Sequence, residues 1–228
     1  MSLNQNQKND YMFREKEDGT LDFIGDFESF YLSDPDPWGQ SATPDGEMSK
    51  YYRHSRDRLS SQLERINPPS LVEIGCGLGY TTEAIQNLLI DTKVIGIDVS
   101  NTAISKAQEA YPHLSFQQGD ITSNSFFLSG KCEVVILNQL LWYILESLSE
   151  TFENCFSILK PNGRIIISQA FLQAPQKYGK DICDGFDGLI SYLGENMVDR
   201  FGIEHSNLDD SNSFVHNDGL IILKKHDS

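Results

Sequence analysis

Residues 72–80 have the sequence VEIGCGLGY, and this stretch decides the fold of the 228-residue chain. The apolar run from Ser70 to Ile74 predicts a short buried strand. Glycines at positions 75, 77 and 79 predict a turn in which the backbone can approach a ligand closely, because no Cβ stands in the way. Residues 81–89 follow with apolar positions at helical spacing. A strand, a glycine turn and a helix N-terminus in succession predict a cradle for a nucleotide-type cofactor.

The glycine spacing distinguishes between two kinds of cofactor. A dinucleotide fingerprint has glycines at its first and third positions and Gly or Ala at its sixth. Counted from Gly75, the sixth position is the bulky Tyr80, and the third glycine comes one place early, at Gly79. This spacing argues against a nicotinamide dehydrogenase. The pattern Glu73-x-Gly75-x-Gly77-x-Gly79 resembles motif I of the class I S-adenosylmethionine (SAM)-dependent methyltransferases. A turn that serves chain reversal alone is the simpler alternative.

The rest of the chain alternates predicted strands and helices. Such alternation predicts a Rossmann-like α/β fold with a seven-stranded, mostly parallel sheet, an antiparallel edge strand and helices on both faces. We expect one domain over residues 1–228, with a SAM-binding core over 67–228 and an N-terminal extension with a helical lid over 1–66. Residues 1–20 are expected to be ordered poorly, or only by contact with the rest of the chain. Strands are expected over 70–74, 93–98, 114–117, 133–138, 164–168, 201–206 and 220–225, and helices over 47–66, 81–89, 101–110, 140–159 and 185–198.

Polar residues follow the ends of the predicted strands, where ligands bind in sheets of this type. Asp98 ends the second strand about 20 residues after the glycine turn, a position from which a carboxylate can accept both ribose hydroxyls. The resemblance, which runs from Leu71 through Ser168, implies a role for each loop. Glu73 and the turn residues Gly75, Cys76, Gly77 and Gly79 would surround the amino-acid portion of SAM. Asp98 would hold the ribose, Val99, Asp120 and Ile121 the adenine, and Asn138 would complete the cofactor site.

The acceptor is expected over the cofactor methyl group, beside the end of the fourth strand. Trp142 and Tyr143 follow that strand and are candidates for the pocket wall, with helix packing as the alternative. Residues 33–39, together with Tyr51-Tyr52-Arg53, resemble the NodS-like branch, which N-methylates glucosamine-type sugars. This resemblance implies an amine of an amino sugar or nucleotide-linked sugar as the acceptor. It adds Trp38 and Tyr52 to the substrate-binding candidates, with a plug on the sheet flank as the alternative role.

The catalytic group is left open by the sequence. The NodS-like branch tends to carry an acidic residue where this chain has Gln139, and an amide cannot take up a proton at neutral pH. An amine could react without a base if it arrives deprotonated, whereas a hydroxyl acceptor would need help from His54 or Tyr143. Two alternatives therefore stand beside an N-methyltransferase: a SAM-binding module without turnover, and an O-methyltransferase of another small metabolite.

Composition excludes several classes of partner. The formal net charge of -15 repels phosphate backbones, which argues against nucleic acid as substrate. No apolar run approaches the length of about 18 residues that crosses a membrane, and the polar start has no signal segment. The four cysteines lack paired spacing, which predicts reduced thiols in a cytoplasmic protein without a metal site. The sequence leaves the oligomeric state open.

Overall fold

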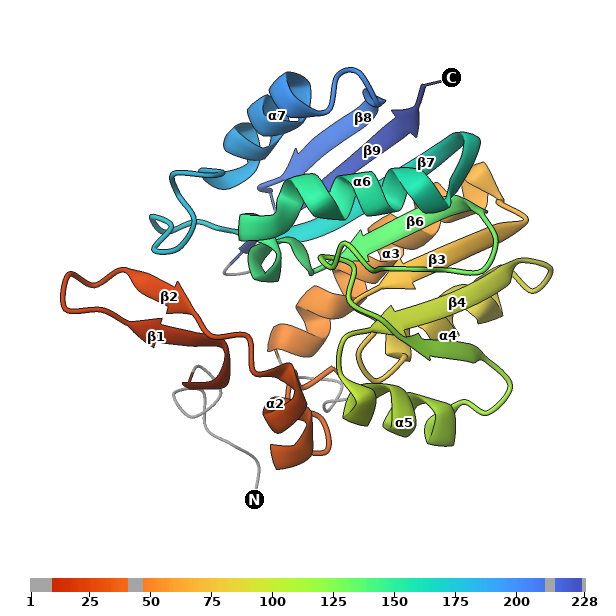
Figure 1. The fold of residues 1–228 in the computed structure, drawn as a ribbon, viewed down its shortest axis with the longest axis horizontal. Helices are drawn as coiled ribbons and strands as arrows, with labels where there is room; N and C mark the ends of the chain where they lie inside the picture. The colour runs from red at the N-terminus through yellow and green to blue at the C-terminus, as the bar shows by residue number, and fades with distance from the viewer. Residues whose placement is uncertain (1–9, 41–46, 212–215, 227–228) are drawn as a thin grey trace.

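The computed structural model describes residues 10–40, 47–211 and 216–226. A seven-stranded sheet forms its centre, with strand order β5-β4-β3-β6-β7-β9-β8 (Figure 1). Its strands are β3 (Ser70–Ile74), β4 (Lys93–Asp98), β5 (Ser115–Gln118), β6 (Cys132–Asn138), β7 (Leu159–Leu172), β8 (Phe201–Asp209) and β9 (His216–Lys225). The helices that pack on it are α3 (Glu47–Ile66), α4 (Tyr80–Leu88), α5 (Asn101–Ala110), α6 (Leu148–Ile158) and α7 (Gly185–Asn196).

The direction of the strands matches the predicted architecture. Strands β5, β4, β3, β6 and β7 pair in parallel, so their carboxyl ends meet at one edge of the sheet. Strand β9 runs antiparallel between β7 and β8. The expected seven-stranded, mostly parallel sheet is confirmed. The reversed strand lies one place in from the edge, because β8 and β9 are close in sequence and pair as neighbours.

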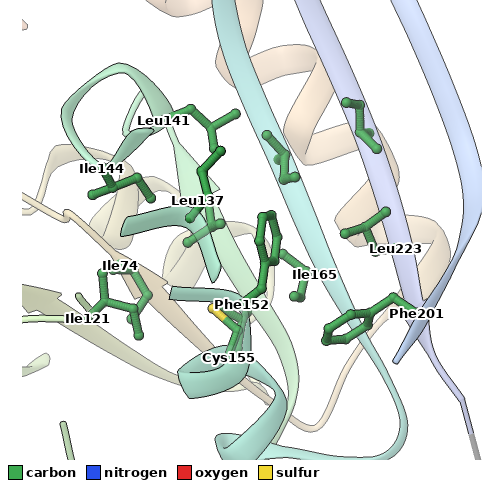
Figure 2. Close-up of a cluster of buried hydrophobic side chains, with 14 of the residues drawn as sticks. Ile74, Ile121, Leu137, Leu141, Ile144, Phe152, Cys155, Ile165, Phe201 and Leu223 are labelled. Atoms are coloured by element: carbon green, nitrogen blue, oxygen red, sulfur yellow. The ribbon is translucent and has the colours of Figure 1, made fainter. Parts of the chain in front are cut away.

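Side chains of the sheet alternate between two hydrophobic layers, as the strand period requires. Leu71 packs with α3 and α4 on one face, while its neighbour Val72 packs with α6 and α7 on the other. Figure 1 shows α6 and α7 in front of the sheet and α3 and α4 behind it. In Figure 2, Phe152 and Cys155 of α6 lie against Ile165 of the sheet in the front layer. Packing in these two layers holds the parallel strands in place, and the polar residues Asp98 and Asn138 lie at the carboxyl ends of two of these strands.

The described part of the N-terminal segment begins at residue 10 and is held by contacts with the rest of the chain, and residues 1–9 lie outside the described residues. Strands β1 (Phe13–Glu15) and β2 (Leu21–Phe23) form an antiparallel hairpin, followed by helix α2 (Phe27–Ser33). Three-residue strands are too short for a periodicity argument, so the hairpin could not be predicted from the sequence. Figure 1 shows the hairpin beyond the carboxyl ends of the parallel strands.

Helix α2 is held against the N-terminus of α5 by its side chains. The Glu28 carboxylate accepts hydrogen bonds from Ser100 Oγ at 2.7 Å and from the Thr102 backbone N–H at 3.2 Å. The Lys106 ammonium donates to the Asp34 carbonyl at 3.1 Å. These contacts place the buried Tyr31 directly over the glycine turn.

The single helix predicted over residues 140–159 is wrong. Two 3₁₀ turns, Leu141–Tyr143 and Leu145–Ser147, precede α6. The Leu141 backbone N–H donates to Gln169 Oε1 at 2.9 Å, and Trp142 Nε1 donates to the Ala170 carbonyl at 2.7 Å. These bonds to β7 replace the first helical turn. Trp142 and Tyr143 consequently lie on a turn at the end of the sheet.

Candidate functional site

The glycine turn after β3 has the backbone conformation that its sequence predicts. Gly75, Gly77 and Gly79 have φ angles of +73°, +52° and +82°, which are strained for residues with a side chain. The backbone N–H groups of Gly75 and Cys76 both donate to the Ile97 carbonyl, at 2.7 and 3.0 Å. A Cβ on Gly77 would lie 2.6 Å from the Tyr31 hydroxyl oxygen. Glycine is therefore required here both by conformation and by the close approach of Tyr31.

Asp98 ends β4 beside this turn. Its Oδ2 accepts the Gly77 backbone N–H at 2.8 Å, and its Oδ1 accepts the Ser100 backbone N–H at 2.9 Å. Burial raises the pKa of Asp98 above its usual range, and these backbone donors oppose the rise. Asp98 also lines the cavity, and a carboxylate has about four acceptor positions, of which two are used. The remaining positions suit a pair of hydroxyl donors such as those of a ribose.

Glu73 lies beneath the turn and does not line the cavity. It is 1% exposed, and the Thr82 hydroxyl donates to its Oε2. Burial raises its pKa from 4.5 to about 7. Cys76 and Gly79 are also absent from the lining among the described residues. These three residues therefore support the turn from behind in this structure, and their direct contact with the cofactor stays a prediction.

The raised pKa of Glu73 predicts a pH-dependent stability. Between pH 4.5 and about 7 the folded chain keeps a proton that the unfolded chain releases, so stability falls as the pH rises through this window. The full loss is on the order of 3 kcal/mol. Glu73→Gln keeps an acceptor for Thr82 without the charge and should remove this slope. Urea unfolding of both proteins from about pH 5 to about pH 8 measures it, and equal slopes would contradict the assignment.

A cavity of about 1160 Å³ opens at the carboxyl ends of the parallel strands. One part of the cavity is formed by the ends of the predicted strands, and it is referred to below as the cofactor half because the sequence predicts the cofactor there. The residues of this part are Gly75, Gly77, Asp98, Val99, Asp120, Ile121 and Asn138. Asp120 Oδ1 accepts the Thr122 backbone N–H at 2.9 Å, which leaves its other oxygen available. Ile121 is buried and Val99 is 40% exposed, so an apolar ring could lie between them. Figure 2 shows Ile121 beside Ile74, which also lines the cavity.

Aromatic rings wall the part of the cavity in which the sequence predicts the acceptor, and this part is referred to below as the acceptor half. Trp38, Tyr52, Trp142 and Tyr143 all line the cavity, and their contact with an acceptor stays a prediction. The ring centroids of Trp38 and Tyr143 are 5.5 Å apart. Burial raises the pKa of Tyr52 to about 12 and also raises that of Tyr143, so both phenols stay protonated at neutral pH. Within the described ranges neither hydroxyl has a hydrogen-bond partner, which leaves both able to bind a ligand.

The other catalytic candidates have structural partners. Gln139 has a φ of +55°, and its amide donates to Tyr51 Oη at 3.0 Å and to Ser55 Oγ at 3.1 Å. Its Oε1 accepts the Ala170 backbone N–H at 2.9 Å. This side chain ties β6 to β7 and α3, although it lines the cavity. His54 lies outside the lining, with its Nε2 2.9 Å from an Asp209 oxygen.

Comparison with known proteins identifies the domain. A family model described as a methyltransferase domain matches residues 72–167, the stretch from the glycine turn to the end of the parallel strands. The matched residues are less than half of the 228-residue chain, and over them the chain is similar to a methyltransferase domain. The putative methyltransferase 235L of Invertebrate iridescent virus 6 is 26% identical over 133 residues, which cover 58% of this chain and 49% of the viral protein. Malonyl-[acyl-carrier protein] O-methyltransferase 1 of Coxiella burnetii is 27% identical over 131 residues, which cover 57% of this chain and 44% of that protein.

The chain spans about half the length of these curated relatives. Among solved structures, the N-methyltransferase NodS from Bradyrhizobium japonicum WM9, in complex with S-adenosyl-L-homocysteine, has a TM-score of 0.62 at 18% identity. The match covers 87% of this chain and 98% of NodS. Similarity at this identity shows the fold, and membership of the NodS-like branch stays a prediction.

Two further residues that line the cavity, Tyr31 and His216, are not among the site residues predicted from the sequence. Tyr31 lies over Gly77, and its hydroxyl accepts a hydrogen bond from Trp38 Nε1 at 3.0 Å. His216 lines the far end of the cavity, where its ring centroid lies 5.8 Å from that of Tyr51. Its Nδ1 is buried without a hydrogen-bond partner in the described part of the chain, and burial lowers its pKa. Neither residue belongs to a motif, so no sequence signal could have found it.

The cysteines and the acidic side chains give no sign of a nucleophile or a metal site among the described residues. All four cysteines are reduced and buried. Burial raises the pKa of Cys76 well above its usual range, which makes it a packing residue rather than a nucleophile. The described ranges contain no cluster of three or more His, Cys, Asp or Glu that could hold a metal ion. None of the helices seen in them has the length and apolar character needed to cross a bilayer.

Proposed function

We propose that this chain transfers the methyl group of SAM to the nitrogen of a neutral amine on a small molecule, such as the amine of an amino sugar. The observation that carries the proposal is the acceptor half of the cavity. Its wall is aromatic, it adjoins the residues that fit the cofactor, and it offers protonated phenols at Tyr52 and Tyr143.

The residues on this wall suit an amine for two reasons. Bound SAM supplies an activated sulfonium methyl group, so the chain's task is to align the acceptor nitrogen in line with it. The phenol oxygens of Tyr52 and Tyr143 can accept hydrogen bonds from the amine and orient its lone pair. Methylation of an amine creates a positive charge, and the faces of Trp38 and Tyr143 stabilise a cation at short range.

An acidic acceptor is less well supported. The charged side chains among the described residues that line the cavity are Asp98, Asp120 and Lys177. The Lys177 side chain is 59% exposed, and its Nζ lies 3.3 Å from a Glu15 oxygen at the surface. A carboxylate acceptor would therefore lack a buried cation to hold it. The net charge of -15 also favours amines over acids. The N-methyltransferase title of NodS agrees with transfer to nitrogen.

The pH dependence of the rate tests the proposal. Without a general base, the reactive fraction of the acceptor is its deprotonated form, so kcat/KM should rise with pH up to the pKa of the amine itself. Amines of different pKa, assayed by release of S-adenosylhomocysteine, should shift this inflection accordingly. An inflection that stays below about pH 6.5 and disappears in His216→Gln would instead assign general-base catalysis to His216.

The same assay separates the alternatives. Methylation of alcohols or carboxylic acids, with amines unreactive, would favour an O-methyltransferase. Binding of SAM by calorimetry without turnover of any acceptor would favour a SAM-binding module. Binding of NAD in place of SAM would contradict the cofactor argument itself.

A further inference from the structure

We propose that the acceptor amine carries an apolar body, an aliphatic chain or hydrocarbon ring system, which binds beneath the β1–β2 hairpin. The inference rests on the proposed N-methylation and names the part of the acceptor that does not react. It follows from the face that the hairpin turns toward the cavity, the wall opposite that face, and the charges around both.

The hairpin is amphipathic, with its apolar face directed into the cavity. Phe13 and Phe23 are cross-strand partners and therefore lie on the same face, together with Leu21, two positions from Phe23. All three line the cavity. The alternate positions Arg14 and Asp22 form the opposite face of the hairpin, and Asp22 pairs there with Lys16 at the surface.

The opposite wall is also apolar. The Phe13 ring packs on that of Tyr178, with centroids 5.2 Å apart, and the Phe23 ring packs on that of Tyr143, with centroids 6.1 Å apart. Leu172, at the end of β7, also lines the cavity and is 50% exposed, although a leucine gains free energy from burial. A bound apolar group would cover this exposed surface. We refer to the part of the cavity lined by Phe13, Leu21, Phe23, Leu172 and Tyr178 as the hairpin compartment.

A main-chain bond holds the compartment together. The Leu21 backbone N–H donates to the Lys177 carbonyl at 3.0 Å, which ties the hairpin to the loop after β7. A two-stranded hairpin is marginally stable by itself in water. The buried residues of the two sheet layers do not include Phe13, Leu21 or Phe23, so the hairpin adds little to the sheet core. What its apolar face does contribute is a wall for the cavity.

Volume and charge agree with an occupant of this kind. Pockets for a single small ligand measure about 300–1,000 Å³, so a cavity of about 1160 Å³ has room for the cofactor and a sizeable acceptor. Asp98 and Asp120 lie in the cofactor half, and the Lys177 ammonium is at the surface with Glu15. The hairpin compartment is therefore suited to a neutral, apolar group, and the reacting amine would lie at Tyr52 and Tyr143.

A series of n-alkylamines from about two to about ten carbons tests the inference, because their basicity is nearly constant while the buried area grows. Affinity for the chain loaded with S-adenosylhomocysteine should rise about three- to fourfold per methylene, and kcat/KM with SAM should rise in parallel. Phe23→Ser should reduce the gain per methylene to less than about twofold, with cofactor affinity unchanged. Phe127→Ser is the matched control, since Phe127 is 74% exposed and outside the cavity lining.

The outcomes separate this inference from the proposed function. Turnover that does not depend on the length of the alkyl group would overturn the inference that the acceptor has an apolar body. The proposed N-methylation would remain. Binding that strengthens with the length of the alkyl group, without any turnover, would support the hairpin compartment. It would overturn the proposal that the protein is an N-methyltransferase. An equal gain in affinity per methylene in Phe23→Ser and Phe127→Ser would show that the alkyl group of the amine binds elsewhere. That result would overturn the assignment to the hairpin.

Discussion

Replacing Asp98 by alanine is expected to weaken SAM binding roughly tenfold to a hundredfold, because charge-assisted hydrogen bonds contribute about 1.5–3 kcal/mol. In the structure, Asp98 also accepts the backbone N–H groups of Gly77 and Ser100 in a buried position. Leaving these donors without a partner should lower the free energy of unfolding by about 1–3 kcal/mol as well.

Calorimetry for the cofactor and urea unfolding for stability measure the two effects separately. Asp120→Ala is the matched control, because this carboxylate accepts hydrogen bonds from Thr122 in an exposed turn. The control should lose some cofactor affinity with little change in stability. If Asp98→Ala lost stability but kept its affinity for SAM, Asp98 would be a structural residue only.

The largest expected effect on stability comes from Arg58→Met. Asp218 is fully buried, and its Oδ2 is paired with the Arg58 guanidinium, which also donates to the Asp218 carbonyl. The Tyr51 hydroxyl, 3.0 Å from the other carboxylate oxygen, cannot neutralise the charge. Removing one partner of a buried ion pair costs about 3–5 kcal/mol, because the remaining charge is left without compensation.

Urea unfolding again provides the measurement, with Arg164→Met as the control. Arg164 pairs with Glu204 where both side chains are exposed, at 27% and 39%. Such a pair contributes about 0–1 kcal/mol. Equal losses in the two variants would show that burial of Asp218 is not what makes its ion pair important.

The core of the fold could be predicted because its signals are local. The run from Ser70 to Ile74, the glycine turn and Asp98 fall within one strand–helix–strand unit, where spacing alone fixes their relative positions. The same holds for Asp120 and Asn138, each at the end of a parallel strand. Residues of this kind reach the cavity because the carboxyl ends of the strands meet at one edge.

The remaining features depend on contacts between distant parts of the chain. The apolar spacing after Leu140 favoured one helix, but bonds from Leu141 and Trp142 to β7 replace its first turn. Gln139 takes the position where the NodS-like branch tends to carry an acidic residue. In the structure its amide forms hydrogen bonds with Tyr51, Ser55 and the backbone of β7. No pattern in the sequence encodes these partners, since they lie on α3 and β7.

The bond between Leu21 and Lys177 also determines the order in which the site can be assembled. The hairpin leaves the ribosome first, but Lys177 and Tyr178 are synthesised only after the five parallel strands of the sheet. A contact between distant residues has to wait for the later of the two to be synthesised. The Leu21–Lys177 bond therefore cannot form until the chain has passed Asp98, Asp120 and Asn138, the residues of the cofactor half. The wall that encloses the acceptor depends on a later part of the chain than the cofactor half does.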